Sequence, residues 1–172
     1  GSGTSGRLGV LDAAECPPTY RTNPAMVQGI IAGGYGALIH SLEGAEDIPD
    51  AGAKAVLDYG ITKKDVVLGI TASSSTPFVL GALGKAKKIN ALTGLLICNE
   101  LPVLSFVDHM LSIIVGPEVI SGSTRMKAGT ATKMALNMIT TTAMIKLNKT
   151  HGNLMVDLKA SNQKLWDRGA RI

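Results

Sequence analysis

The feature that most constrains the fold is a repeated order in which a continuous apolar stretch leads through a turn into a helical pattern. The clearest example is Asp65–Thr71 (DVVLGIT), which runs through four hydroxyl residues into a helix predicted over Pro77–Ile89. Thr76 and Pro77 suit the N-cap and the first turn of that helix. Strands without polar alternation are typical of parallel sheets covered by helices on both faces. The pattern therefore predicts an α/β fold.

The same order extends over the rest of the chain. Further buried strands are predicted at Met26–Ala32, Thr93–Cys98 and Met110–Val115. Helices are predicted at Arg7–Ala14, ended by Pro17-Pro18, and at Ala37–Leu42, Ala51–Asp58, about Thr124–Leu147 and, as a polar helix, from Ala160 onward. No repeat or linker interrupts the 172 residues, so we expect one domain.

Composition excludes several classes of function. Aromatic residues make up only 3% of the chain, which argues against a nucleic-acid binder that stacks bases. No apolar run is long enough for a membrane span. The two cysteines, Cys16 and Cys98, form no CxxC pair, and the three histidines have no metal-ligand spacing. We therefore expect a cytoplasmic protein in a reducing compartment.

Three hydroxyl-rich turns each precede a predicted helix. In open parallel sheets, ligands bind beyond the carboxyl ends of the strands. Backbone N–H groups at a helix start attract a phosphate, and hydroxyls can bind sugar oxygens. Helix capping is the alternative role of such turns. Together they predict a phosphorylated sugar or polyol as ligand, with candidate binding residues Thr4, Ser5, Ser73, Ser75, Thr76, Ser121, Ser123, Thr124 and Lys127.

The opening residues 1–6 (GSGTSG) formally fit the dinucleotide-binding pattern GxGxxG. That pattern requires an acidic residue about twenty positions further on, at the end of the second strand. Here that strand leads into Gly33-Gly34 instead, and no Gly-Lys-Ser/Thr follows as in a Walker loop. A cradle for a monophosphate and a plain structural turn both remain as interpretations.

Three glutamates lie beside glycine or proline breaks, where a side chain can be directed into a cleft. They are Glu15, Glu43 and Glu46. Two carboxylates in unlike environments can serve as general acid and general base, although most glutamates are simply solvated.

Methionines recur along the predicted helix at about Thr124–Leu147. Met126, Met134, Met138 and Met144 are spaced roughly for one helix face. Packing in the core or in a dimer is the expected role of such a face.

Several longer motifs resemble the N-acetylmuramic acid 6-phosphate etherase family, which has the sugar isomerase (SIS) type of domain. The match is collinear and includes Gly3–Tyr20, Ile31–Gly34, Glu43–Asp47, Gly116–Ala131 and Gly152–Asp157. The resemblance implies a three-layer, flavodoxin-like parallel sheet with helices on both faces, working as a homodimer without metal or organic cofactor. It also implies that residues 1–172 form a single phosphosugar-binding SIS domain that lacks its first strand and its flanking helical regions.

The resemblance further implies a reaction. Members of the family are lyases that cleave the D-lactyl ether of N-acetylmuramic acid 6-phosphate, giving N-acetylglucosamine 6-phosphate and D-lactate, in the recycling of cell-wall amino sugars. In the family, a glutamate matching Glu15 protonates the leaving lactate. One matching Glu46 removes the proton from C2 and later activates water, and Glu43 is expected to bind the substrate.

Two other functions remain open at this point. A non-catalytic phosphosugar-binding regulator, similar to the glucokinase regulatory protein, would lack the glutamate matching Glu15. A sugar-phosphate isomerase would need a base near C2 but no acid for lactate. One departure from the etherases is that their usual Ser-Gly-Arg-Thr-Pro is replaced by Ser73-Ser74-Ser75-Thr76-Pro77, without the arginine.

Overall fold

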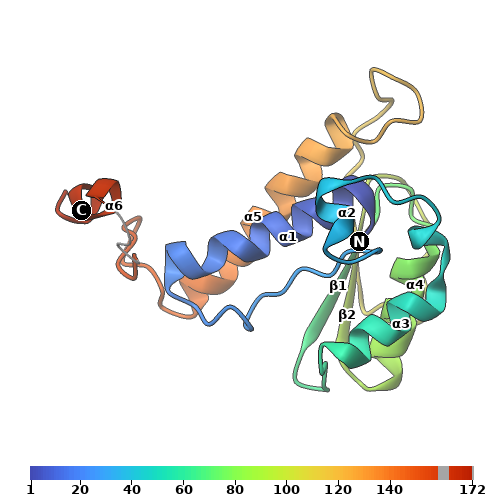
Figure 1. Cartoon of the computed structure of the whole chain (residues 1–172), viewed down its shortest axis with the longest axis horizontal. Coiled ribbons are helices and arrows are strands. Elements are labelled where there is room, and N and C mark those ends of the chain that lie inside the picture. The colour runs from blue at the N-terminus through green and yellow to red at the C-terminus, as the bar shows by residue number, and fades with distance from the viewer. Residues whose placement is uncertain (159–162, 172) are drawn as a thin grey trace.

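The computed structural model describes residues 1–158 and 163–171, which contain a parallel sheet of three strands. The strands are β1 (Val66–Ile70), β2 (Leu92–Ile97) and β3 (His109–Ser112), in the order β1-β2-β3. Ile70 is paired with Leu96, which fixes the register between β1 and β2. Helices cover both faces of this sheet (Figure 1), so the predicted α/β architecture is confirmed.

One face of the sheet carries α3 (Pro49–Asp58) and α4 (Pro77–Lys88). Helix α4 packs on β2 through a cluster that includes the fully buried Leu83 and Leu95. Gly69 of β1 allows this close packing, because a Cβ at that position would lie 2.8 Å from Leu83 Cδ1. Apolar burial of this kind contributes most of the stability of the sheet–helix layer.

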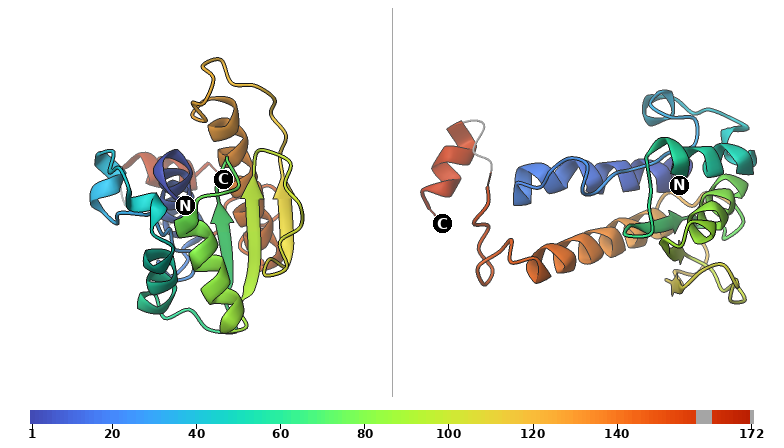
Figure 2. Two further views of the ribbon diagram at one scale, coloured as in Figure 1. Left: turned by 90° about the vertical axis from the view of Figure 1, so that its right-hand side faces the viewer. Right: turned by 90° about the horizontal axis from the view of Figure 1, so that it is seen from below.

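The opposite face carries α1 (Gly3–Tyr20) and α5 (Lys127–Lys146). Leu136 of α5 packs with Leu96 of β2 in a second core cluster. Beyond the sheet the two helices continue side by side as a projecting pair, which we call the α1–α5 arm (Figures 1 and 2). The short helix α6 (Gln163–Gly169) lies beyond the end of the arm.

A buried polar contact joins the two helices of the arm. Asp12 is 7% exposed, and its Oδ1 accepts hydrogen bonds from Asn137 Nδ2 at 2.7 Å and from Thr140 Oγ1 at 3.1 Å. Cys16 and Met144, nearer the tip, are each 2% exposed. A buried carboxylate without such donors would be costly, so these contacts fix the two helices relative to each other.

Most of the predicted elements are present. The three strands and helices α3, α4 and α5 begin and end within three residues of their predicted bounds, as does α2 (Gly36–Ile39). The polar C-terminal helix is present as α6, whereas its predicted start at Ala160 lies outside the described residues. No helix in the described part of the chain is both long and apolar enough to cross a membrane.

The strand predicted at residues 26–32 is absent. Within the described residues, this segment makes two backbone hydrogen bonds of the kind found between neighbouring strands, and both are to Gly1. The amino group of Gly1 donates to Ile30 O, and Gly1 O accepts from the N–H of Ala32, each at 3.0 Å. A strand needs a continuous row of such bonds with a neighbour, and a single residue cannot supply it. The apolar pattern was therefore a correct guide to burial of Ile31 and Ala32, but the prediction of a strand is wrong.

Helix α1 is longer than predicted at both ends. It begins at Gly3 and continues through Pro17 and Pro18 to Tyr20, so the predicted glycine turn is confined to the first two residues. Proline has a helical φ angle but no N–H, so Pro17 and Pro18 leave the carbonyls of residues 13 and 14 without their usual i→i−4 donors near the end of the helix. Arg21, with a φ of 50°, ends the helix in the left-handed conformation.

Candidate active site

The three hydroxyl-rich turns meet at the carboxyl-end edge of the sheet. Gly1 lies at the end of β1, since a Cβ on Gly1 would be 2.9 Å from Ile70 O. Thr4, in the first turn of α1, lies against α5, because a Cβ on Gly129 would be 3.5 Å from Thr4 Cγ2. A small apolar cluster joins the turn after β1, the end of β2 and the start of α5 through Ala72, Cys98 and Ala128. This is the edge at which the sequence predicts a ligand.

The glycine turn holds one of the candidate catalytic glutamates. Ser2 is at the N-cap position of α1, and its Oγ donates a hydrogen bond of 2.6 Å to Glu46 Oε2. Glu46 lies in the short 3-10 helix η1 (Ala45–Asp47), directly after Gly44, whose φ of 75° permits the sharp turn. Thr4 and Ser5 follow in the first turn of α1, where both are half-buried. Sequence reasoning missed Ser2, although it lies in the turn already selected.

In the second turn, one of the predicted binding hydroxyls, that of Thr76, is directed inward. Thr76 Oγ1 lies 2.8 Å from Thr71 Oγ1, and both residues are buried, so this pair stabilises the turn itself. Ser73 and Ser75 are exposed and available to a ligand. Ser74 between them is 4% exposed, has a φ of 73°, and its hydroxyl has no hydrogen-bond partner among the described residues.

The third turn precedes α5, and a carboxylate of the same chain occupies the start of that helix. Glu118 accepts hydrogen bonds from the backbone N–H of Lys127 at 3.0 Å and of Ala128 at 2.9 Å. These two hydrogen bonds, the one from Ala128 most strongly, hold the pKa of Glu118 below its ordinary value because they stabilise the carboxylate. Lys127 Nζ donates to Pro117 O at 2.8 Å, while Ser121, Ser123 and Thr124 lie in the preceding loop, Ser123 half-buried and the other two exposed.

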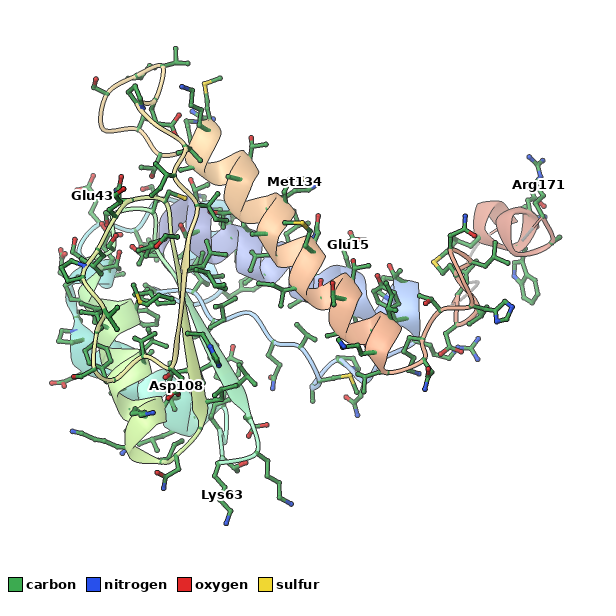
Figure 3. All side chains as sticks on the ribbon, turned by 180° about the vertical axis from the view of Figure 1, so that it is seen from behind. Glu15, Glu43, Lys63, Asp108, Met134 and Arg171 are labelled. Carbon is green, nitrogen blue, oxygen red and sulfur yellow. The ribbon has the colours of Figure 1, made fainter. Side chains whose placement is uncertain are left out.

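Glu15 does not lie at this edge within one copy of the chain. It is an exposed residue of α1, thirteen positions after Ser2, and a helix rises about 1.5 Å per residue, so roughly 20 Å separate it from the Ser2–Glu46 contact. Figure 3 shows Glu15 on the α1–α5 arm and Glu43, which is exposed, beyond the sheet-side end of the arm. A single copy therefore brings Glu46 to the hydroxyl turns and keeps Glu15 apart from them.

Two clefts lie away from the turns. A cleft of about 350 Å³ is lined by α3 and by residues of the irregular segment 29–38, and one of about 210 Å³ lies at the tip of the arm, where Thr19 and Thr141 line it. Neither contains a hydroxyl of the three turns.

The residues that could hold a metal or react through sulfur are few. Within the described ranges, His, Cys, Asp and Glu residues do not gather in groups of three or more. Burial, followed by the charges of Asp12 and Glu15, raises the pKa of the Cys16 thiol, which keeps it protonated. Cys98 is also buried and free.

A parallel sheet with helices on both faces and hydroxyl turns at its carboxyl edge places the chain among the open α/β domains. The family model described as "Glucokinase regulatory protein N-terminal SIS domain" matches residues 1–87, just over half of the 172 residues. The chain belongs to this family of SIS domains.

Curated relatives are similar over the whole chain. A protein of Clostridium acetobutylicum is 60% identical, one of Caldanaerobacter subterraneus subsp. tengcongensis 56%, and one of Crocosphaera subtropica 54%. Each is named "N-acetylmuramic acid 6-phosphate etherase", and each match covers 100% of this chain. The chain spans 56–57% of the length of these relatives. The resemblance to the etherases is thereby confirmed.

Proposed function

We propose that this protein is a lyase that cleaves the D-lactyl ether of N-acetylmuramic acid 6-phosphate in the recycling of cell-wall amino sugars. The observation that carries the proposal is the 52–60% identity, over the whole chain, to relatives named as etherases of this compound. The hydroxyl turns at the carboxyl edge and the Ser2–Glu46 contact support it, because they join a phosphate-binding surface to a carboxylate.

The proposed chemistry requires two carboxyl groups in opposite protonation states. Opening of the sugar ring exposes the C1 aldehyde, which acidifies the proton on C2. Glu46, as carboxylate, removes this proton while Glu15, as carboxylic acid, protonates the C3 ether oxygen, so that D-lactate leaves and a C2–C3 double bond forms. Once Glu46 has passed the C2 proton to solvent, it takes a proton from a water that adds at C3 and then delivers that proton to C2, while Glu15 is reprotonated from solvent, which gives N-acetylglucosamine 6-phosphate. General acid–base assistance of this kind typically contributes about 10²–10⁴-fold to the rate.

Binding in this proposal is shared among the three turns. Ser73 and Ser75 are the exposed hydroxyls of the second turn, and Thr4 and Ser5 lie at the start of α1. Holding the 6-phosphate there would orient C2 and C3 toward Glu46. The start of α5 is already capped by Glu118, so its contribution would come from Ser121, Ser123, Thr124 and the Lys127 ammonium rather than from its first N–H groups.

The separation of about 20 Å between Glu15 and Glu46 requires a second copy of the chain. In the proposed homodimer, Glu15 of one copy reaches the Ser2–Glu46 contact of the other, so that each site contains side chains from both. The protein would work in the cytoplasm, a location supported by its two free, buried cysteines.

We also propose that a strand pairs along the open edge of β1 in the active enzyme, as part of one SIS domain. Gly1 supports this, because it bonds to Ile30 and Ala32 as a residue of a parallel strand does, while its other side faces Ile70 O. The 64% exposure of Val66 leaves room for such a strand. A chimera in which this chain is joined to the flanking sequence of the Clostridium relative would supply it, and should be more active than the 172 residues alone.

Release of D-lactate from N-acetylmuramic acid 6-phosphate, measured on the chimera with a coupled dehydrogenase, tests the function. Glu15→Gln and Glu46→Gln should each lower kcat by about 10²–10⁴-fold. Asp58→Asn is the control, because Asp58 pairs with Lys54 at the exposed end of α3, away from the hydroxyl turns, and its loss should leave the rate unchanged. Absence of lactate from the chimera, at substrate concentrations that the protein demonstrably binds, would refute the etherase.

A non-catalytic regulator is the second candidate, and the match to the glucokinase regulatory protein domain favours it. A regulator would bind sugar 6-phosphates without releasing lactate, and Glu15→Gln would leave binding intact. An isomerase would convert an aldose phosphate to a ketose phosphate, again without dependence on Glu15.

A further inference from the structure

We infer that Arg7 is a positioning residue for the candidate site, because it fixes the path of the segment that carries Glu43 and Glu46. The consequence for the reaction rests on the proposed function, in which Glu46 is the base. The contacts of Arg7 belong to the fold itself and can be tested without any substrate.

The guanidinium of Arg7 joins α1 to the end of α2. Its Nε donates a hydrogen bond of 3.1 Å to Leu38 O, and its Nη2 donates one of 3.0 Å to His40 O. Leu38 lies in α2, and His40 is the C-cap residue of that helix. The last carbonyls of a helix have no donor within the helix, so a side chain that bonds two of them fixes where the helix ends. We call this pair of bonds the Arg7 bridge.

Residues 36–47 are attached to α1 at two separate points, the Arg7 bridge and the Ser2–Glu46 contact. Within the described part of the chain, these are the hydrogen bonds that connect the segment to residues outside 34–47. Ser2 and Arg7 are five residues apart, about 7.5 Å along α1, so together they restrict rotation of the segment. Without the bridge, only the Ser2 hydroxyl and the packing of Ala45 against the core would hold Glu46 in place.

The contacts of Arg7 depend on the shape of its side chain as well as on its charge. Arg7 takes part in none of the ion pairs between described residues, which are Lys54–Asp58, Lys87–Asp108 and Lys149–Asp157. A guanidinium holds its donors in a planar fork that can bond two acceptors at once, whereas a lysine ammonium is a flexible point charge. Arg7→Lys should therefore keep the charge and lose the bridge, which separates positioning from simple attraction of a phosphate.

Amide hydrogen exchange, measured by NMR on the 172-residue chain, tests the bridge independently of the reaction. The N–H of His40 is bonded within α2 and that of Asp47 within the turn at η1, so the two amides report on both ends of the segment. Arg7→Lys should speed exchange at both about tenfold, because the segment opens more often. Unchanged exchange, or faster exchange at His40 alone, would show that the bridge does not reach Glu46 and would overturn the inference.

Steady-state kinetics of lactate release on the chimera provide the second test. Arg7→Lys should lower kcat about tenfold and leave KM within about twofold, because the base is misplaced while the hydroxyl turns are intact. Arg21→Lys is the matched control, since Arg21 also donates to a backbone carbonyl, Leu158 O at 3.4 Å, but at the far end of α1. A rise in KM at unchanged kcat would mean that Arg7 binds the substrate directly, which contradicts a positioning role.

A double variant shows whether Arg7 acts through Glu46. In a Glu46→Gln background, Arg7→Lys should cause no further loss of the residual rate, whereas a further tenfold loss, about the size of the single effect, would mean that it acts by another route. A chimera that releases no lactate would remove the etherase. The exchange rates of His40 and Asp47 would then still decide whether Arg7 holds the segment, so the two failures are distinguishable.

Discussion

The hydroxyl of Ser2 donates a 2.6 Å hydrogen bond to the carboxylate of Glu46, across 44 residues of sequence. This contact ties the side chain of a glutamate in a 3-10 helix to the start of α1, at the edge of the sheet. It thereby holds the carboxylate beside the hydroxyl turns, where the phosphate of a sugar is expected.

Ser2→Ala should lower the rate of lactate release about tenfold, mainly through kcat, because it removes one charge-assisted hydrogen bond from the proposed base. Ser41→Ala, which alters an exposed serine in the loop after α2, should have no effect. Steady-state kinetics on the chimera would measure both. An unchanged kcat for Ser2→Ala would mean that Glu46 does not depend on this contact.

Mixing two inactive variants should restore activity if the site is shared between copies. In a mixed dimer of Glu15→Gln and Glu46→Gln, one site receives an intact Glu15 and an intact Glu46, and the other receives neither. After equal mixing and re-equilibration, about one quarter of the unaltered rate should return. Each variant alone should remain inactive, and a mixture that stays inactive would argue that both glutamates act within one copy.

Ser74→Gly should stabilise the fold. The φ of 73° at Ser74 is unfavourable for a residue with a Cβ, by about 1–2 kcal/mol, and its buried hydroxyl lacks a partner in the described part of the chain. Urea unfolding should give a higher midpoint at an unchanged slope. Ser73→Gly, at the exposed neighbouring position, should instead leave stability the same or lower it.

The cap of α5 by Glu118 should make part of the stability depend on pH. Since the backbone N–H groups of Ala128 and Lys127 lower the pKa of Glu118 in the folded chain, its contribution is fully present above the ordinary pKa of 4.5 and is lost as the pH falls through the lower, folded value. Glu118→Gln should therefore lower the melting temperature at pH 7, and should lower it by less at pH 3. Glu100→Gln, an exposed glutamate after β2, is the control, and an equal loss at both pH values would contradict the cap.

Local sequence was sufficient to predict those strands and helices whose own residues show a clear apolar run or capping pattern. β1 is a continuous apolar run, and α4 begins at a Thr-Pro pair that fits an N-cap and a first turn. The segment 26–32 has an equally apolar sequence, yet its state depends on whether another strand lies beside it, and no local pattern contains that information. The end of α1 depends similarly on packing of the arm, which continues the helix past Pro17 and Pro18.

The site was predictable as a set of turns but not as a geometry. The three turns meet because the strands are parallel, so their carboxyl ends lie at one edge of the sheet. The distance from Glu15 to Glu46 depends instead on the unbroken length of α1. The sequence predicted a shorter helix there, because Pro17 and Pro18 were expected to end it. The cap by Glu118 comes from nine residues ahead of Lys127, too far for a local capping pattern to reveal it.

The continuity of α1 between Ser2 and Glu15 also restricts which changes of chain length the domain can accept. One residue inserted between them would move Glu15 by about 1.5 Å along the helix and turn it by about 100°, away from the face that the second copy would meet. Its contacts with α5 would have to shift by the same step. Insertions and deletions should therefore be absent from this part of α1 in active members of the family, and should collect in the exposed loop between β3 and α5.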